Sequence, residues 1–175
     1  MILNSIARAF GLGIISVALS VQSHADPVGT VNIKWTANIY QWSCTVSSAS
    51  SNQIVPLGTW NTSELTKNKK TRPVPFSISL SGCNSNTVAV SFLGTADSTN
   101  SNYLALTADS TAKNVAIEIS DSNQNTISLN QMMNPITIDS SGAVNMNFFA
   151  NYVTYGTGVT AGTANADATF TLTYQ

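Results

Sequence analysis

The stretch Ala168-Thr169-Phe170-Thr171-Leu172-Thr173-Tyr174-Gln175 alternates apolar and polar residues up to the last position of the sequence. Alternation with a period of two is typical of a β-strand that has one face against a core and the other in water. We expect one edge of this strand to need a partner, because no later segment of the sequence is left to pair with it. That partner would come from earlier in the chain or from another chain.

A second stretch of the same kind, residues 30–39, lies near the other end of the sequence. It alternates as cleanly as the final strand does, and it also reads as a half-buried strand. Two free-ended strands on one small chain indicate a protein that completes its neighbours.

Residues 1–25 have the pattern of a secretory signal peptide. Arg8 supplies the positive charge, residues 9–21 are mostly apolar, and Ser23 and Ala25 are small residues placed before a cleavage site. A transmembrane anchor is the alternative, but the apolar stretch is short for spanning a bilayer. We therefore expect a mature chain of residues 26–175, a length that suits one domain with a single core.

The charge and histidine content of the mature chain exclude several function classes. Without Arg8 the chain has 6 basic and 8 acidic residues, a net charge of −2, and its one basic cluster (residues 67–72) reads as a solvated loop. This balance does not predict a nucleic-acid or membrane partner. His24, the only histidine, is lost with the signal peptide, which removes the commonest general base and metal ligand. We expect no cofactor and no metal.

The mature sequence predicts an all-β fold. It is rich in Ser, Thr and Asn, and short alternating segments are separated by Gly, Pro and Asn turns, which indicates an antiparallel β-sandwich. The expected strands are 31–40, 53–60, 74–81, 87–93, 115–120, 144–154 and 168–175. Their inward faces are expected to carry Val144, Met146, Phe148, Ala150 and Tyr152; Phe76, Ile78 and Leu80; and Val88, Val90 and Phe92.

Two local patterns resemble functional motifs but favour structural interpretations. Ser110 and Lys113 fit the Ser-x-x-Lys spacing of serine acyl enzymes, but the surrounding polar loop lacks the helix and further motifs that this chemistry needs. The three tryptophans could stack on sugars, yet Trp35 is in phase with an apolar stripe and Trp60 ends an apolar strand. Packing is the preferred interpretation for them.

Cys44 and Cys83 are the only cysteines, and both remain in the mature chain. An even pair of cysteines in an exported protein predicts a disulfide. Closing a loop of about 40 residues would stabilise the fold by roughly 4 kcal/mol through the entropy of the unfolded chain.

Several weak motifs occur together in a characteristic order. A signal peptide precedes an alternating segment, Cys44 follows, Cys83 comes about 40 residues later, and a terminal strand ends in Tyr174-Gln175. Residues 111–119 and 161–170 add two further matching stretches. The whole mature chain resembles a fimbrial (pilin) subunit of the chaperone–usher class, similar to type 1 fimbrial proteins.

The resemblance implies an incomplete immunoglobulin-like sandwich that lacks its last strand. A periplasmic chaperone would supply the strand first, and the N-terminal extension of the next subunit would replace it, which is β-strand addition. The implied organisation is a donor extension at 26–40 and a pilin domain at 41–175. The side chains expected to enter the acceptor's groove are Gly29, Val31, Ile33, Trp35 and Ala37.

Two of these donor positions depart from the family pattern. Ala37 stands where glycine is common, and Trp35 stands where smaller apolar residues are common, so the register is open and a roomy acceptor pocket is expected. The alternative is that residues 31–39 pair within their own domain, as any first strand does.

The resemblance also implies a recognition pattern at the C-terminus. Gly162 is fourteenth from the end and Tyr174 is second, a spacing similar to that of the family's chaperone-recognition motif. Phe170, Leu172 and Tyr174 would line one side of the open groove.

The function expected from this resemblance is that of a non-enzymatic structural subunit of an adhesive surface fimbria, polymerising by donor-strand exchange. Its expected partners are neighbouring pilus subunits, a periplasmic chaperone and an outer-membrane usher, with a host receptor reached through the fibre. It would pass through the periplasm to the cell surface. The alternatives are a minor adaptor, a single-domain adhesin that binds a host glycan or protein, and, least favoured, a secreted hydrolase.

Overall fold

The computed structural model describes residues 43–155 and 158–175, and these belong to one compact unit, residues 39–175. The expected signal peptide (1–25) and donor extension (26–40) lie outside the described residues. The described chain contains seven strands and two short helices. In chain order they are β1 (Thr45–Val46), α1 (Ser48–Ser51), α2 (Thr62–Asn68), β2 (Val74–Ser81), β3 (Thr87–Gly94), β4 (Ala116–Ser120), β5 (Ile136–Thr137), β6 (Val144–Val153) and β7 (Ala168–Tyr174).

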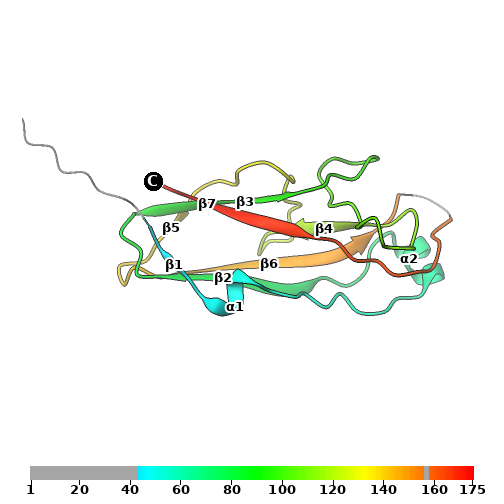
Figure 1. The fold of residues 1–175 in the computed structure, drawn as a ribbon, viewed down its shortest axis with the longest axis horizontal. Coiled ribbons are helices and arrows are strands. Elements are labelled where there is room, and N and C mark those ends of the chain that lie inside the picture. Colours follow the sequence, from blue (N-terminus) through cyan, green and yellow to red (C-terminus); the bar gives the residue numbers. More distant parts are fainter. Residues whose placement is uncertain (1–42, 156–157) are drawn as a thin grey trace, which may run out of the picture. The chain divides into compact units, whose positions relative to one another are not determined.

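The strands form two antiparallel sheets, so the prediction of an all-β sandwich is confirmed (Figure 1). One sheet has the order β1-β2-β6-β4 and the other has the order β5-β3-β7. The long pairings fix the register: Phe76 of β2 lies opposite Phe148 of β6, and Val90 of β3 lies opposite Leu172 of β7. The predicted strands 74–81, 87–93, 115–120, 144–154 and 168–175 agree with β2, β3, β4, β6 and β7 to within one residue at each end.

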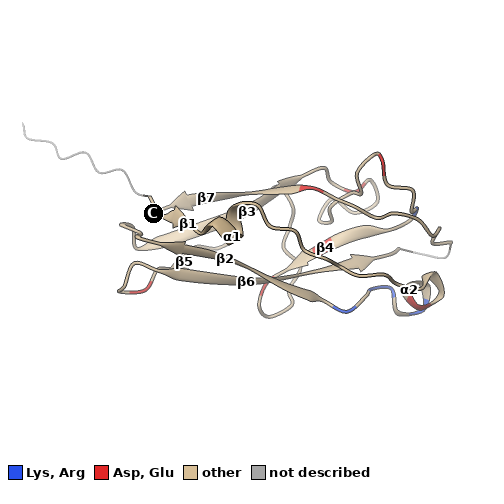
Figure 2. Ribbon diagram, turned by 60° about the horizontal axis from the view of Figure 1, so that its bottom comes forward, with Lys and Arg blue, Asp and Glu red and all other residues tan. Residues whose placement is uncertain are grey.

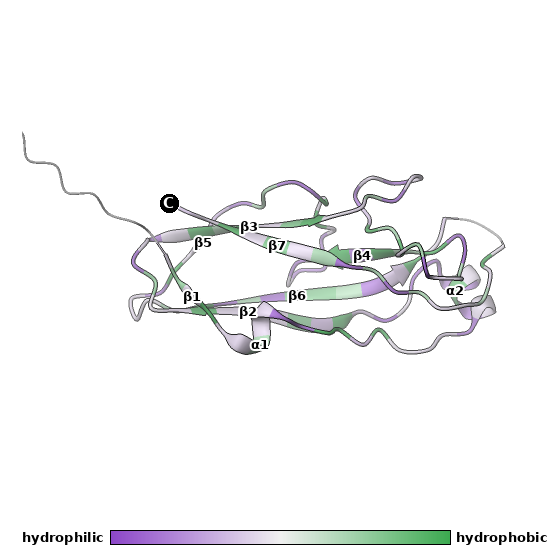
Figure 3. Ribbon diagram, viewed as in Figure 1, coloured by the Kyte–Doolittle hydropathy of each residue, from purple (hydrophilic) through white to green (hydrophobic). Residues whose placement is uncertain are grey.

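The core lies between the inward faces of the two sheets. Ile78, Val88, Val90 and Phe148 are at most 1% exposed, and all four were placed on inward faces by the alternation. Phe148 packs edge-on against Phe92, with ring centroids 5.0 Å apart. Figure 3 shows apolar residues concentrated along β3 and β4.

The segment 53–60 corrects one strand prediction. It alternates in sequence, but the structure gives it no regular secondary structure and no pairing with any described strand. Only some of its apolar side chains are covered: Leu57 is buried, Val55 is half-buried, and Ile54 is 90% exposed. Alternation describes which side chains can be buried, and it does not supply the neighbouring strand that a ladder requires.

The helix α2 spans seven residues and includes the first residues of the basic segment 67–72, for which a loop was expected. Asn61 caps its N-terminus, because the side-chain oxygen of Asn61 accepts a 2.9 Å hydrogen bond from the amide of Ser63. Leu65 is buried, and the helix ends at Lys69, which has left-handed backbone angles. The basic residues 67–72 lie at this end of α2 and in the loop that follows, and the lysines and arginine among them are exposed (Figure 2). No helix of the described residues is long and apolar enough to cross a membrane.

Candidate strand-acceptor site

The strand β7 is the last strand of its sheet, and only one of its edges is paired within the described residues. Its partner is β3, along the full length from Ala168 opposite Gly94 to Tyr174 opposite Val88. The other edge has no strand beside it among residues 43–155 and 158–175. An unpaired edge of this length presents a row of N–H and C=O groups that can template another strand.

The hydrogen-bonding pattern shows which residues form this open edge. Gln175 and Thr87 exchange two backbone hydrogen bonds, each of 3.1 Å. In an antiparallel pair hydrogen-bonded and non-hydrogen-bonded residue pairs alternate, so Thr173 and Thr171 also face β3 with their backbone groups. The N–H and C=O groups of Phe170, Leu172 and Tyr174 therefore point away from β3 and toward the open edge.

The same three residues carry the apolar side chains of β7. Phe170, Leu172 and Tyr174 contact the core cluster but are only half-buried, while the threonines between them are exposed. On β6, which is paired on both edges, the corresponding core residues Met146 and Phe148 are 2% and 1% exposed. The core is therefore covered less completely beside β7 than beside β6.

A second backbone stretch that belongs to no strand ladder of the described residues runs between α1 and α2. The backbone N–H groups of residues 54–60 donate no hydrogen bond to any described residue, although Val55 packs against the core. In the view of Figure 2 this segment crosses between β7 and β2. Backbone donors are almost always satisfied by protein or by water. Two unpaired backbone edges, each with half-buried apolar side chains, thus occur in one domain.

The disulfide between Cys44 and Cys83 is present, as the sequence predicted. It joins the residue before β1 to the loop after β2. The strand β1 pairs with β2 through only two residues, Thr45 and Val46. The bond therefore holds the start of the domain in place where few ladder contacts do so.

Gly162 lies in the segment that leads into β7, where it packs tightly against residues 111–112. A β-carbon added to Gly162 would lie 2.5 Å from the amide nitrogen of Ala112 and 2.6 Å from the carbonyl carbon of Thr111. The neighbouring Thr163 carbonyl accepts backbone hydrogen bonds from both Thr111 and Ala112, at 3.1 and 3.0 Å. A side chain at position 162 would push these two segments apart. The sequence spacing marked Gly162 without revealing this packing role.

We expect Gly162→Ala to destabilise the domain by about 1–3 kcal/mol, because the added methyl group overlaps backbone atoms that cannot rotate away. The urea midpoint of the subunit with a donor peptide bound measures this loss. Ala161→Ser is the matched control, since Ala161 is exposed. Equal midpoints for the two variants would contradict the packing role.

A tyrosine hydroxyl ties β6 to the same segment. The hydroxyl of Tyr152 donates a 2.8 Å hydrogen bond to the carbonyl oxygen of Ala164, and burial raises the pKa of Tyr152 above its usual range. The group stays protonated at neutral pH and can donate this bond. This hydrogen bond helps to position the segment that leads into β7.

Ser110 and Lys113 form part of this packing. The hydroxyl of Ser110 accepts a 2.9 Å hydrogen bond from the amide of Asn165 and donates to the carbonyl of that residue at 3.2 Å. Lys113 is exposed and pairs through its backbone with Thr160. These two hydrogen bonds give Ser110 a structural role in its loop. The predicted donor residues Gly29, Val31, Ile33, Trp35 and Ala37 lie outside the described residues.

Comparison with known proteins agrees with this geometry. A model of the family "Fimbrial protein" matches residues 31–175. The chain belongs to the fimbrial protein family. It is 37% identical to the fimbrial-like protein FimF of Salmonella typhimurium over the full length of both chains, and 34% identical to the fimbrial subunit type 1 of that organism over 90% of this chain and 91% of the relative.

Solved structures of fimbrial proteins share the fold. The P pilus rod subunit PapA, 22% identical, aligns with a TM-score of 0.64 over 75% of this chain and 99% of PapA. A type I fimbria protein of Burkholderia pseudomallei, 31% identical, aligns with a TM-score of 0.58 over 75% of this chain and 88% of the other. These matches confirm the immunoglobulin-like sandwich of pilus subunits.

The family assignment decides the general function. This fimbrial protein is a structural, non-enzymatic subunit of a fimbria, and proteins of its kind assemble with other pilus subunits. The least favoured alternative, a secreted hydrolase, is thereby set aside.

Proposed function

We propose that this fimbrial subunit polymerises by donor-strand exchange, with an incoming strand seated along the open edge of β7. The observation that carries the proposal is the combination found at Phe170, Leu172 and Tyr174. Their backbone groups point to the unpaired edge, and their half-buried apolar side chains line the same place. A strand added here would gain backbone hydrogen bonds and would bury those side chains.

The donor in this proposal is the segment 26–40 of another subunit. Its residues Val31, Ile33 and Trp35 share one face of an alternating strand, so their side chains would enter the core beside β7. Because the donor of one subunit fills the acceptor of the next, the interface is head-to-tail and does not close on itself, and a fibre results.

The partners that the subunit binds before it joins a fibre are inferred from the class of protein. We infer that a periplasmic chaperone first occupies the edge of β7 and that an outer-membrane usher receives the complex. The signal-peptide pattern of residues 1–25 supports export to the periplasm, and the family supports a final location in a surface fimbria. The recognition of Gly162 and Tyr174 by the chaperone, and the place of Tyr174 beside the open groove, belong to this proposal.

The donor half of the proposal is tested by placing one charge on either face of the extension. Ile33→Asp puts a carboxylate on the inserted face and is expected to abolish incorporation of the subunit, because an unpaired charge would be buried in the acceptor. Asn32→Asp puts the same charge on the opposite face and is expected to leave incorporation intact.

The measurement is the ladder of fimbrial polymers on an SDS gel of unheated cell-surface extracts. Normal incorporation of the Ile33→Asp variant would show that this face of the extension does not enter a groove. Loss of incorporation for Asn32→Asp alone would place the register one residue away.

A further inference from the structure

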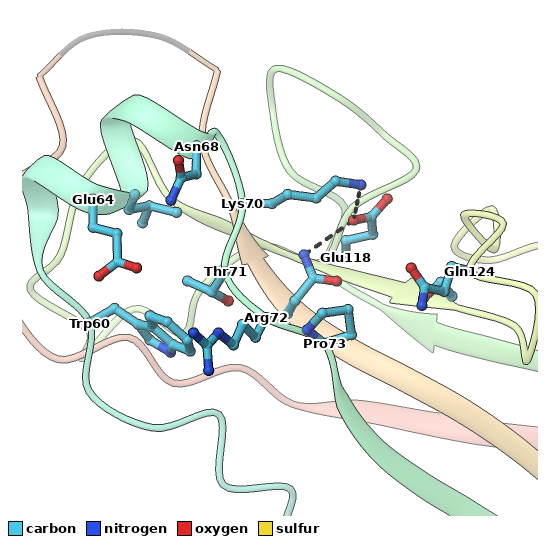
Figure 4. A pocket seen from close by; sticks show the side chains of 12 residues that line it. Trp60, Glu64, Asn68, Lys70, Thr71, Arg72, Pro73, Glu118 and Gln124 are labelled. Carbon is cyan, nitrogen blue, oxygen red and sulfur yellow. Dashed lines mark hydrogen bonds and ion pairs between the residues drawn. The ribbon is translucent and has the colours of Figure 1, made fainter.

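A polar cavity lies beside α2, on elements other than the open edge of β7. Its volume is about 400 Å³, toward the lower end of the roughly 300–1,000 Å³ typical of ligand pockets. Figure 4 shows side chains from the end of α2, the loop before β2 and strand β4 converging on it. The residues that carry the argument are Trp60, Thr71, Arg72, Glu118, Ser120 and Asn151.

A buried carboxylate lies in the wall of the cavity. Glu118 is 4% exposed, at the middle of β4 and opposite Asn151 of β6. Its oxygens accept hydrogen bonds from the Thr126 hydroxyl at 2.6 Å and the Asn151 amide at 3.2 Å, and Lys70 lies 3.5 Å away. The carboxylate is therefore held in one orientation by neighbours on three sides.

Three further buried side chains bring unused hydrogen-bonding capacity to the same cavity. Ser120 is 3% exposed, and its hydroxyl makes no hydrogen bond to any described residue. Asn151 is 2% exposed, and its side-chain nitrogen donates hydrogen bonds to Glu118 and to the carbonyl of Tyr152. Its side-chain oxygen accepts no hydrogen bond from the described part of the chain. The Thr71 hydroxyl accepts a bond from the amide of Tyr152 and donates to no described acceptor. No fully buried side-chain nitrogen or oxygen of the described residues lacks a hydrogen-bond partner, so the unused oxygens of Ser120 and Asn151 are accessible from the cavity and can bond a polar ligand.

An aromatic ring held in a fixed position forms another wall. The indole nitrogen of Trp60 donates a 2.7 Å hydrogen bond to the carbonyl oxygen of Leu57, and the side chain is half-buried. Figure 4 shows the guanidinium of Arg72 next to this ring. A rigid aromatic side chain supplies an apolar face at low entropic cost.

We propose that this cavity binds one neutral sugar residue of a glycan. Hydroxyl, amide and carboxylate groups would bond the sugar hydroxyls, and the Trp60 ring would cover an apolar face of the sugar. The charges around the cavity, Glu64 and Glu118 against Lys70 and Arg72, cancel, which favours a neutral ligand over an acidic one. None of these residues belongs to β7, the strand at whose edge the donor is proposed to add.

Saturation-transfer NMR on the full mature chain, with a panel of methyl hexopyranosides and with sialic acid, tests the proposal. We expect transfer to at least one neutral glycoside. Ser120→Ala removes one unused hydroxyl and breaks no hydrogen bond of the described chain, and it should weaken binding about fivefold, the value of one hydrogen bond. Glu118→Gln should weaken binding at least as much.

Ser122→Ala is the matched control, since Ser122 follows β4 two residues later, is exposed and does not line the cavity. It should bind as the unaltered chain does. Binding that Ser120→Ala and Glu118→Gln leave unchanged, transfer to sialic acid alone, or no transfer to any glycoside would each overturn the proposal. Unchanged thermal melting of Ser120→Ala shows that a loss of binding does not come from unfolding.

Discussion

A subunit that carries Leu172→Asp will fail to accept a neighbour's strand, whereas one that carries Thr173→Asp will accept it. Leu172 is a half-buried residue of β7 in contact with the core, and Thr173 next to it is exposed. Strand addition would cover the new carboxylate at position 172 and leave it unpaired. The cost is about 3 kcal/mol or more, which lowers the equilibrium constant for strand addition by at least ~100-fold.

Both variants place the same charge on the same strand, so the comparison isolates the face that is covered. The measurement is the amount of SDS-resistant polymer formed when each purified subunit is mixed with a fixed donor-bearing subunit. Protease resistance of the unmixed subunits controls for folding. Polymer from Leu172→Asp equal to that from the unaltered chain would show that β7 does not border the acceptor site.

Loss of the disulfide has the second large expected effect. Replacing both Cys44 and Cys83 by serine should cost about 4 kcal/mol, because the bond closes a loop with a sequence separation of 39. Domains of this size have total stabilities of only about 5–15 kcal/mol. The two-residue pairing of β1 with β2 offers little to replace the bond, so β1 should detach first.

Urea unfolding of the peptide-filled subunit measures this effect, with an expected fall in midpoint of ~2 M. A reductant should shift the unaltered protein to the same midpoint and should leave the double variant unchanged. A double variant as stable as the oxidised protein would contradict the account of how β1 is held.

The strands with strong side-chain alternation could be predicted from the sequence. The segments 74–81 and 144–154 could be placed because Phe76, Ile78, Met146 and Phe148 repeat with a period of two and sit between turn residues. The same rule failed at 53–60, where alternating side chains have no strand beside them. It also missed β1 and β5, each of two residues, which are too short to show a period.

The open edge of β7 and the polar cavity differ in how far each could be predicted from the sequence. The apolar row of β7 could be predicted, because Phe170, Leu172 and Tyr174 alternate with threonines. The polar cavity could not, because Glu118 reads as the outward residue of an alternating strand while every residue of β4 is buried. Its partner Asn151 comes from a distant strand, and only the pairing of β4 with β6 brings the two together.

Assembly by strand addition requires that the domain lack a strand beside β7. The most direct test is a thermal melt of the chain without residues 26–40, with and without synthetic peptides of that segment or of the equivalent extension of a co-assembling subunit, followed by an unheated SDS gel. If the strand is missing, the peptide will raise the melting temperature by a large amount and give an SDS-resistant, peptide-bound band. A shortened chain that is stable alone and melts at the same temperature with every extension would show that the sandwich is complete.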